Sequence, residues 1–188
     1  GKPRVAGLLL AKELQYLDQT ISNAERPFVA VLGGAKVSDK MGAIDNLLGK
    51  VDTILIGGAM AYTFLVAAGT EVGSSLVERD RVEEAKEMLS AAQKSTTELF
   101  LPTDHVCVKQ IVQGTPVQVV TGAIPNGWMG VDIGLETVAK YTHLLKLAKT
   151  IVWNGPMGVF EIEPFDVGTR QVAEQIASAT ENNAVSIV

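Results

Sequence analysis

Two lysines beside a pair of glycines give the first sign of chemistry in this sequence. Gly33-Gly34-Ala35-Lys36 follows an apolar run, and Lys40 comes four residues after Lys36. If both lysines lie at the start of a helix they share one face, where two ammonium groups repel each other unless an anion lies between them. Phosphate oxygens accept charge-assisted hydrogen bonds from such groups. The pattern therefore predicts a polyphosphate site, and the alternative is two solvated surface lysines.

Two further apolar runs end in small residues in the same way. Gly57-Gly58-Ala59-Met60 follows one of them, and Asn154-Gly155-Pro156-Met157-Gly158 follows another. In open α/β sheets ligands bind outside the carboxyl ends of the strands, and glycine lets a ligand come close to the backbone. The helices that follow would direct N–H groups and the positive end of their dipoles toward the same edge. The three segments therefore predict one anion-binding edge.

Five short apolar runs supply the strands that such an edge requires. They are rich in Val, Ile and Leu without clear alternation, as expected for strands that are covered on both faces. Apolar residues at helical spacing lie between them, for example from Val82 to Ala92 and from Val138 to Ala148. This order predicts an α/β fold, a three-layer Rossmann-like domain with a central, mostly parallel sheet. The predicted strands are Phe28–Leu32, Thr53–Ile56, Leu99–Leu101, Thr150–Trp153 and Ala184–Val188.

Three segments need separate interpretations. Val106–Val112 and Pro116–Val120 flank Gln113-Gly114-Thr115, which predicts a small antiparallel hairpin insertion. Val5–Ser22 has a helical leucine stripe, so it is either the first helix of the domain or a connector from something upstream. The last predicted strand is expected to be buried, and because working loops follow strand ends, we expect the chain to be truncated at Val188.

Composition excludes several classes of protein. The 188 residues carry a net charge of −5, which argues against a nucleic-acid surface, and no apolar run reaches the roughly 18 residues of a membrane helix. Cys107 is the only cysteine, so no internal disulfide is possible, and with no recognisable signal sequence this favours a cytoplasmic setting. Cys107 is expected to be a small core residue, and His105 and His143 to be structural or exposed.

The standard signatures of other sites are absent. The nearest match to a P-loop, Gly42 to Gly49-Lys50, has the wrong spacing and places Val51 where a hydroxyl is needed. No G-x-G-x-x-G follows the first strand, which weakens the interpretation as a nicotinamide-dependent oxidoreductase. No group of His, Cys and carboxylate residues has zinc spacing, so no metal site is predicted.

The segments around the predicted edge resemble phosphoglycerate kinase. Four segments in the same order carry the resemblance, which runs from Pro3 to Val188 and covers most of the carboxyl-side domain of that family. Two positions depart from the family pattern, since Thr103 stands where valine is usual and Val131 where leucine is common. The four segments are Val31–Lys40, Ile56–Phe64, Gly127–Gly134 and Ile151–Glu161.

The resemblance implies a role for each residue of a nucleotide site. Lys36 would touch the transferring phosphoryl group as the catalytic residue, while Lys40 would bind the nucleotide phosphates with Asn154 beside them. Glu161 would accept hydrogen bonds from the ribose hydroxyls; without the resemblance, it is interpreted as a solvated acid at a strand end. The small residues that would line the adenine slot are Gly34, Ala35, Gly58, Val131, Pro156 and Val159.

The resemblance also implies an organisation and an activity. Residues 1–25 would be an interdomain connector helix, and residues 26–188 a nucleotide-binding domain that is incomplete at its carboxyl end, with the amino-side domain absent. The reaction would be the transfer of a phosphoryl group between ATP and the carboxyl group of 3-phosphoglycerate, a glycolytic kinase reaction. The nucleotide would carry Mg²⁺, whose protein ligand would follow Val188, and 3-phosphoglycerate would bind the absent domain.

From the same resemblance we expect the intact protein to be a cytoplasmic monomer that binds ATP or ADP and neither nucleic acid nor membrane. The fragment alone is expected to be inactive. Two other functions remain open at this stage, a non-catalytic nucleotide-binding module and, less favoured, the oxidoreductase.

Overall fold

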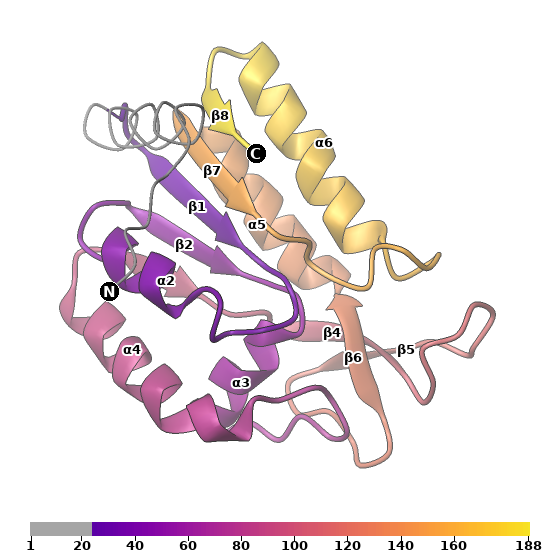
Figure 1. The fold of residues 1–188 in the computed structure, drawn as a ribbon. Helices are drawn as coiled ribbons and strands as arrows, with labels where there is room; N and C mark the ends of the chain where they lie inside the picture. The colour runs from indigo at the N-terminus through magenta and orange to yellow at the C-terminus, as the bar shows by residue number, and fades with distance from the viewer. Residues whose placement is uncertain (1–23) are drawn as a thin grey trace, which may run out of the picture.

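The computed structural model describes residues 24–188, and its largest element is a five-stranded parallel sheet in the order β3-β2-β1-β7-β8. Figure 1 shows the strands β1, β2 and β7 pointing the same way, so their carboxyl ends share one edge. The predicted connector helix lies outside the described residues, except for residues 24 and 25, which are in neither a helix nor a strand. The strands are β1 (Phe28–Leu32), β2 (Thr53–Ile56), β3 (Glu98–Phe100), β7 (Thr150–Asn154) and β8 (Val185–Ile187).

The predicted strands agree with the observed ones within one residue at each end. The bounds of β1 and β2 are as predicted, while β3 begins and ends one residue earlier than predicted and β7 ends one residue later. The prediction that the last strand is buried is wrong. Because β8 lies at the edge of the sheet and pairs only with β7, Val185 is 49% exposed.

Helices cover both faces of this sheet, which confirms the predicted three-layer α/β fold (Figure 1). Alternate residues of β1 enter different cores: Phe28 and Leu32 pack with the first group of helices, and Val31 packs with the second. Each fully buried side chain of this size contributes roughly 1.5–3 kcal/mol. The first group consists of α2 (Met41–Leu47), α3 (Met60–Ala67) and α4 (Val82–Lys94), which follows the short turn η1 (Arg79–Arg81); the second consists of α5 (Leu135–Leu147) and α6 (Val167–Glu181).

The predicted antiparallel hairpin is present, and a third strand extends it into a small antiparallel sheet. It contains β4 (Asp104–Val108), β5 (Gln118–Thr121) and β6 (Met129–Ile133) in the order β5-β4-β6. The two predicted arms are too long, since β4 ends at Val108 and β5 begins at Gln118. The strand β6 was not predicted, because glycine and aspartate are poor strand formers and both lie in its middle.

Two contacts tie the helices to the sheets near the carboxyl edge. The hydroxyl of Tyr141 on α5 donates to the carbonyl oxygens of Ile56 (2.7 Å) and Phe100 (3.1 Å), which end β2 and β3. The hydroxyl of Thr169 on α6 accepts a hydrogen bond from the N–H of Met157 (3.0 Å), in the loop after β7. None of the described helices is long enough and apolar enough to cross a membrane.

Candidate functional site

The three glycine-rich loops meet at the carboxyl edge of the large sheet. The N–H of Gly34 donates to the carbonyl oxygen of Pro156 (2.9 Å), and the N–H of Gly58 donates to that of Met157 (2.8 Å). The N–H of Met60 closes the set by donating to the carbonyl oxygen of Gly34 (3.0 Å). The loops after β1, β2 and β7 therefore form one continuous floor, as their positions at the strand ends predicted.

The glycine N–H groups in two loops of this floor are already used within the protein. The N–H of Gly33 donates to the carbonyl oxygen of Asn154 (2.9 Å) and the N–H of Gly57 to that of Leu32 (2.9 Å), so the four glycine N–H groups of the loops after β1 and β2 have protein partners. The N–H of Met41, the first residue of α2, donates to the carbonyl oxygen of Val37 (3.0 Å). The N–H of Met60, the first residue of α3, donates to the carbonyl oxygen of Gly34, as described above. The first N–H of α2 and the first N–H of α3 are therefore not free to bind an anion.

Two of the glycines are required for different reasons. Gly58 has φ +67°, and a Cβ built there lies 2.5 Å from both the nitrogen and the oxygen of Gly34, so no side chain fits. Gly34 has φ +110°, a conformation that L residues rarely adopt, yet a Cβ built there meets no atom within 4 Å. Gly58 is therefore needed for packing, whereas Gly34 leaves open space beside the floor.

That open space is a cleft of about 180 Å³ between the loops and β6. Its walls are mostly apolar, as is usual for sites that hold a flat ring. Glu161 lies in a turn at one side and is exposed, which is not the strand end that the sequence suggested. The predicted slot residues Gly34, Ala35, Gly58, Val131, Pro156 and Val159 all line this cleft.

Tyr62 also lines the cleft, and sequence reasoning missed it. It lies on α3, is 4% exposed, and its hydroxyl oxygen would be 1.9 Å from a Cβ built on Gly130. Burial, with smaller contributions from nearby Cys107 and Asp132, raises the pKa of Tyr62, so the hydroxyl stays protonated. An aromatic residue in a largely apolar helix looks like an ordinary core residue, so the sequence held no signal for this position.

The charged rim consists of Lys36, Lys40 and Asn154. The Nζ of Lys40 donates to Oδ1 of Asn154, which joins the turn after β1 to the end of β7. Lys36 is exposed and lies in that turn, because α2 begins only at Met41. The prediction that both lysines lie on one helix is therefore wrong, although both do lie beside the strand ends.

Glu78 holds the turn that carries Lys36. Its carboxylate accepts hydrogen bonds from the hydroxyl of Ser38 (2.7 Å) and from the N–H of Ser38 (3.1 Å). Burial raises the pKa of Glu78. The two bonds from Ser38, a third from Val37 and the charge of Lys36 lower it by more, so the net shift of the pKa is downward. Glu78 therefore stays ionised near Lys36 and lowers the net positive charge of the rim.

The remaining singled-out residues lie where the sequence predicted. Cys107 is buried in β4, and burial raises its pKa to about 11, so it is a neutral thiol. His105 is buried in the same strand, and burial lowers its pKa to about 4. His143 is exposed on α5. None of the three lines the cleft.

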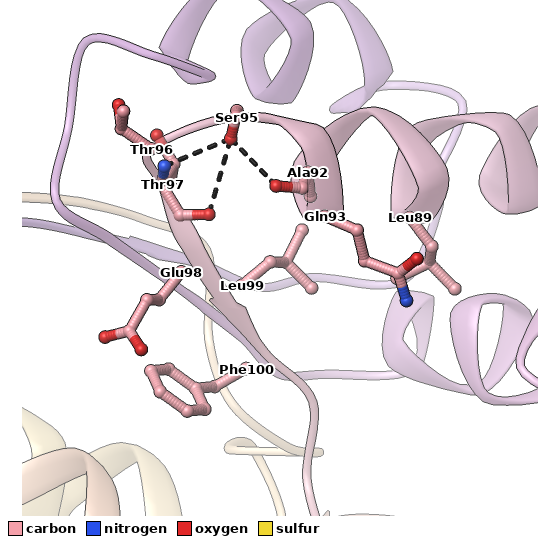
Figure 2. Close-up of a pocket in the computed structure, with 9 residues that line it drawn as sticks. All are labelled: Leu89, Ala92, Gln93, Ser95, Thr96, Thr97, Glu98, Leu99 and Phe100. Carbon is pink, nitrogen blue, oxygen red and sulfur yellow. Dashed lines mark hydrogen bonds between the residues drawn. The ribbon is translucent and has the colours of Figure 1, made fainter.

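A larger hollow of about 370 Å³ lies at the other end of the sheet, where α4 leads into β3 (Figure 2). The hydroxyl of Ser95 donates to the carbonyl oxygen of Ala92 (2.9 Å) and accepts from the N–H of Thr97 (3.0 Å), which caps the end of α4. A helix C-terminus is the negative end of the dipole, and Glu98 adds a negative charge. This hollow therefore suits an anion less well than the cleft, which has Lys40 beside it.

The match to known families agrees with this geometry. The family model described as phosphoglycerate kinase matches residues 2–188. The phosphoglycerate kinase of Rhodopirellula baltica is 56% identical over 191 residues, covering 100% of this chain and 47% of the relative. The phosphoglycerate kinase of Thermosipho africanus is 52% identical over 188 residues, covering 99% of this chain and 47% of the relative.

Solved structures give the same result. The structure of phosphoglycerate kinase from Coxiella burnetii matches with a TM-score of 0.89 at 40% identity, covering 96% of this chain and 46% of that chain. The phosphoglycerate kinase from Pyrococcus horikoshii matches with a TM-score of 0.78 at 29% identity, covering 98% and 51%. The chain spans about half the length of the curated relatives it matches. With a family match over nearly its whole length, this chain belongs to the phosphoglycerate kinase family.

Proposed function

We propose that this chain is the carboxyl-side, nucleotide-binding part of an enzyme that reversibly transfers a phosphoryl group between ATP and 3-phosphoglycerate. The observation that carries the proposal is that an apolar cleft, whose floor is made of glycine-rich loops, lies next to a charged rim. The rim bond from Lys40 to Asn154 lies next to the cleft, since Asn154 is two residues before the lining residue Pro156. Family membership supports the same function.

In this proposal the adenine ring occupies the slot between the floor and β6. Gly34, Ala35, Gly58 and Pro156 contact the ring from the floor side, while Val131 and Val159 contact it from the other. Small apolar surfaces suit a flat ring, which has polar groups only at its edges. The exposed carboxylate of Glu161 accepts hydrogen bonds from the ribose hydroxyls, as two adjacent hydroxyl donors require.

The phosphates lie along the rim in the same proposal. Lys40 and Asn154 bind the phosphate chain, and Lys36 contacts the phosphoryl group that transfers. Because the glycine N–H groups after β1 and β2 are used, the lysine side chains supply most of the positive charge. Phosphoryl transfer of this kind depends on positioning and charge neutralisation, so no covalent enzyme intermediate is needed.

The described residues do not fit a metal site of their own. No group of three or more His, Cys, Asp or Glu side chains among residues 24–188 could hold a metal ion. We therefore propose that Mg²⁺ comes with the nucleotide phosphates, with its protein ligand in a part of the protein after Val188. We also propose that 3-phosphoglycerate binds a domain outside these residues, that the intact enzyme is a cytoplasmic monomer, and that this polypeptide alone has no kinase activity.

Thermal unfolding with added ligands tests the binding part of the proposal. ADP at 100 times its Kd should stabilise the folded chain by about 2.7 kcal/mol, whereas NAD should have no effect. Protection by NAD alone, or by neither ligand, would refute a nucleoside diphosphate site. A coupled assay with ATP and 3-phosphoglycerate should give no turnover until the amino-side domain and the carboxyl-terminal segment of a relative are supplied. Binding that never leads to turnover in the completed protein would favour the non-catalytic module instead.

A further inference from the structure

Asp132 is a buried acid directly beside the cleft. It follows the lining residue Val131 in β6 and is 2% exposed. Its Oδ2 accepts a hydrogen bond from the N–H of Gly168 (2.6 Å), in the first turn of α6, and its Oδ1 accepts one from the N–H of Ile133 (2.9 Å). Asp132 therefore connects the small sheet to the start of α6.

The carboxyl group fills the space between two glycines. A Cβ built on Gly158 lies 2.4 Å from Oδ1 of Asp132, and one built on Gly168 lies 2.4 Å from the same oxygen. Gly158 belongs to the loop after β7, which also carries Val159 and Glu161 into the cleft wall. The loop and the start of α6 thus close tightly around one side chain.

The same loop is joined to β6 by a second contact. The N–H of Val159 donates to the carbonyl oxygen of Val131 (2.8 Å), and both side chains pack in one apolar cluster with Phe165. The segment 158–168 is therefore attached to β6 at Val131 and at Asp132. Val131 and Val159 form the side of the proposed adenine slot that faces the floor, and their relative positions depend on this attachment.

Asp132 is a costly residue for this place in the fold. Burial raises its pKa to about 7, and nearby Asp166 adds to that effect, while hydrogen bonds from Gly168 and Ile133 oppose it. The Oδ1 atom of Asp166 is itself buried with no hydrogen-bond partner among the described residues. Burying an acid without a cation costs free energy, and such residues are concentrated at functional sites.

We propose that Asp132 is a positioning residue for the nucleoside end of the site, which holds the segment 158–168 against β6 and so fixes Val159 and Glu161. This inference rests on the proposed function, because it assumes that the cleft binds adenine and ribose. It assigns no contact between Asp132 and the ligand. Asp132 sets the width of the slot and the place of the ribose acceptor, whereas the phosphate rim is independent of it.

Asp104 provides a matched control within the same small sheet. It is also 2% exposed, and its two oxygens accept hydrogen bonds from the N–H groups of Glu136 (3.0 Å) and Thr137 (2.8 Å) at the start of α5. A Cβ built on Gly134 lies 2.1 Å from its Oδ2. Asp104 resembles Asp132 in being buried against a glycine and in binding N–H groups at a helix start, although it also accepts a hydrogen bond from the hydroxyl of Thr137 (2.5 Å). Asp104 and its partners lie outside the cleft lining.

Asp132→Asn and Asp104→Asn test the proposal in the full 188-residue chain. Each substitution turns an oxygen that accepts an N–H into an NH₂ group, which leaves one backbone donor unpaired. Calorimetric titration with ADP and with inorganic pyrophosphate measures the two ends of the site separately. Asp132→Asn should weaken ADP binding roughly tenfold, the loss expected for one hydrogen bond to a charged group, and leave pyrophosphate binding within about twofold. Asp104→Asn should change neither affinity, although both variants should unfold at lower temperature.

The outcomes separate this inference from the proposed function. If the unaltered chain binds neither ADP nor pyrophosphate, the proposed function is wrong and the inference falls with it. If the unaltered chain binds ADP and folded Asp132→Asn binds it equally well, or loses both ligands equally, only the positioning role is wrong. If Asp132→Asn does not fold, amide hydrogen exchange of the unaltered chain decides: ADP, but not pyrophosphate, should slow exchange of the Gly168 amide and leave that of Thr137 unchanged. Equal exchange at Gly168 with and without ADP would overturn the proposal.

Discussion

The cleft and its charged rim lie side by side on the same loops, but the cleft floor is built from backbone and the rim from side chains. The floor of the cleft is made of backbone, where Gly34, Gly58 and Pro156 contact each other directly through hydrogen bonds and close packing. The rim is made of side chains, and Lys36 and Asn154 are exposed. A backbone-built surface has little freedom to adapt, whereas exposed side chains can be exchanged with little effect on folding. Substitutions in the cleft should therefore change stability, and those in the rim should change affinity.

The largest effect is expected from Gly58→Ala in the floor. The added Cβ would lie 2.5 Å from backbone atoms of Gly34, at a residue with φ +67°. Overpacking and backbone strain together should lower the free energy of unfolding by about 3 kcal/mol or more, measured by urea denaturation. Gly42→Ala is the matched control, because Gly42 lies in α2 with no atom within 4 Å of a built Cβ, and it should gain about 0.5–1 kcal/mol. Equal stability of Gly58→Ala and the unaltered chain would show that the floor can adapt.

The next effect is a pH dependence that belongs to the cleft and not to the rim. The pKa of Asp132 is raised to about 7 from 3.8, so the folded state holds this proton more tightly than the unfolded state. The stability that the protonated group contributes is fully present below about pH 4 and is lost as the pH rises through 7, with a slope of at most about 1.4 kcal/mol per pH unit. Around Asp132, Asp166 adds negative charge and the Tyr62 hydroxyl is neutral, while Arg170 lies 3.7 Å from Asp166 and reduces its effect.

Urea denaturation of the unaltered chain and of Asp132→Asn between pH 4 and pH 8 isolates this slope from the opposite slope of His105, whose pKa burial lowers to about 4. Asp132→Asn should remove it, so that the difference in unfolding free energy between the variant and the unaltered chain changes steadily over this range. Lys40→Met, in the rim, should leave the slope as it is. A constant difference between Asp132→Asn and the unaltered chain would mean that Asp132 is ionised throughout this pH range.

The sequence predicted the parts of this site that depend on position along the strands. The strands β1 and β2 are continuous apolar runs, so their bounds and their carboxyl ends could be placed directly. Because parallel strands end at a common edge, three glycine-rich segments far apart in the sequence could be expected to meet, and they do. The resemblance added the slot residues, which line one cleft, but their roles in binding remain predictions.

The sequence could not predict which groups the backbone atoms would contact. The helix starts were expected to direct N–H groups at the edge, but the partner of each N–H depends on how the three loops pack, and the first N–H of α3 binds Gly34 in another loop. The helix α2 begins only at Met41, after a turn in which Ser38 donates a hydrogen bond to Glu78. Glu78 is 40 residues further along the chain, so the sequence around Ser38 does not reveal this contact. The exposure of β8 follows from its place at the sheet edge, which a run of apolar residues does not reveal.

In the rim, Lys36→Met and Lys40→Met should lower affinity without lowering stability. Lys40→Met removes an ammonium group that binds the phosphate chain, so the Kd for ADP should rise about tenfold to a hundredfold, the value of a hydrogen bond between charged groups. Lys36→Met removes the ammonium group that contacts the transferring phosphoryl group, which ADP lacks, so a rise of the same size should appear in the Kd for ATP and not in that for ADP. Lys50→Met is the control, because Lys50 is exposed and lies just before β2, at the opposite end of the sheet. Calorimetric titration at two salt concentrations should also show a weaker salt dependence for the two rim variants. If Lys50→Met has the same effect, the lysines act only through net charge.

The smallest effect is expected at Val131, one of the two positions where the sequence was interpreted as departing from the family pattern. Val131 lines the cleft and packs against Val159, so the extra methylene of Val131→Leu extends the apolar wall that would face the adenine ring. Burying one more methylene is worth about 0.8 kcal/mol, which should tighten ADP binding up to about fourfold. Pyrophosphate has no base, so its affinity should not change. A weaker affinity for ADP with unchanged stability would mean that the slot cannot hold both the adenine ring and a longer side chain at residue 131. The width of the slot, which we attribute to Asp132, would then be the limit.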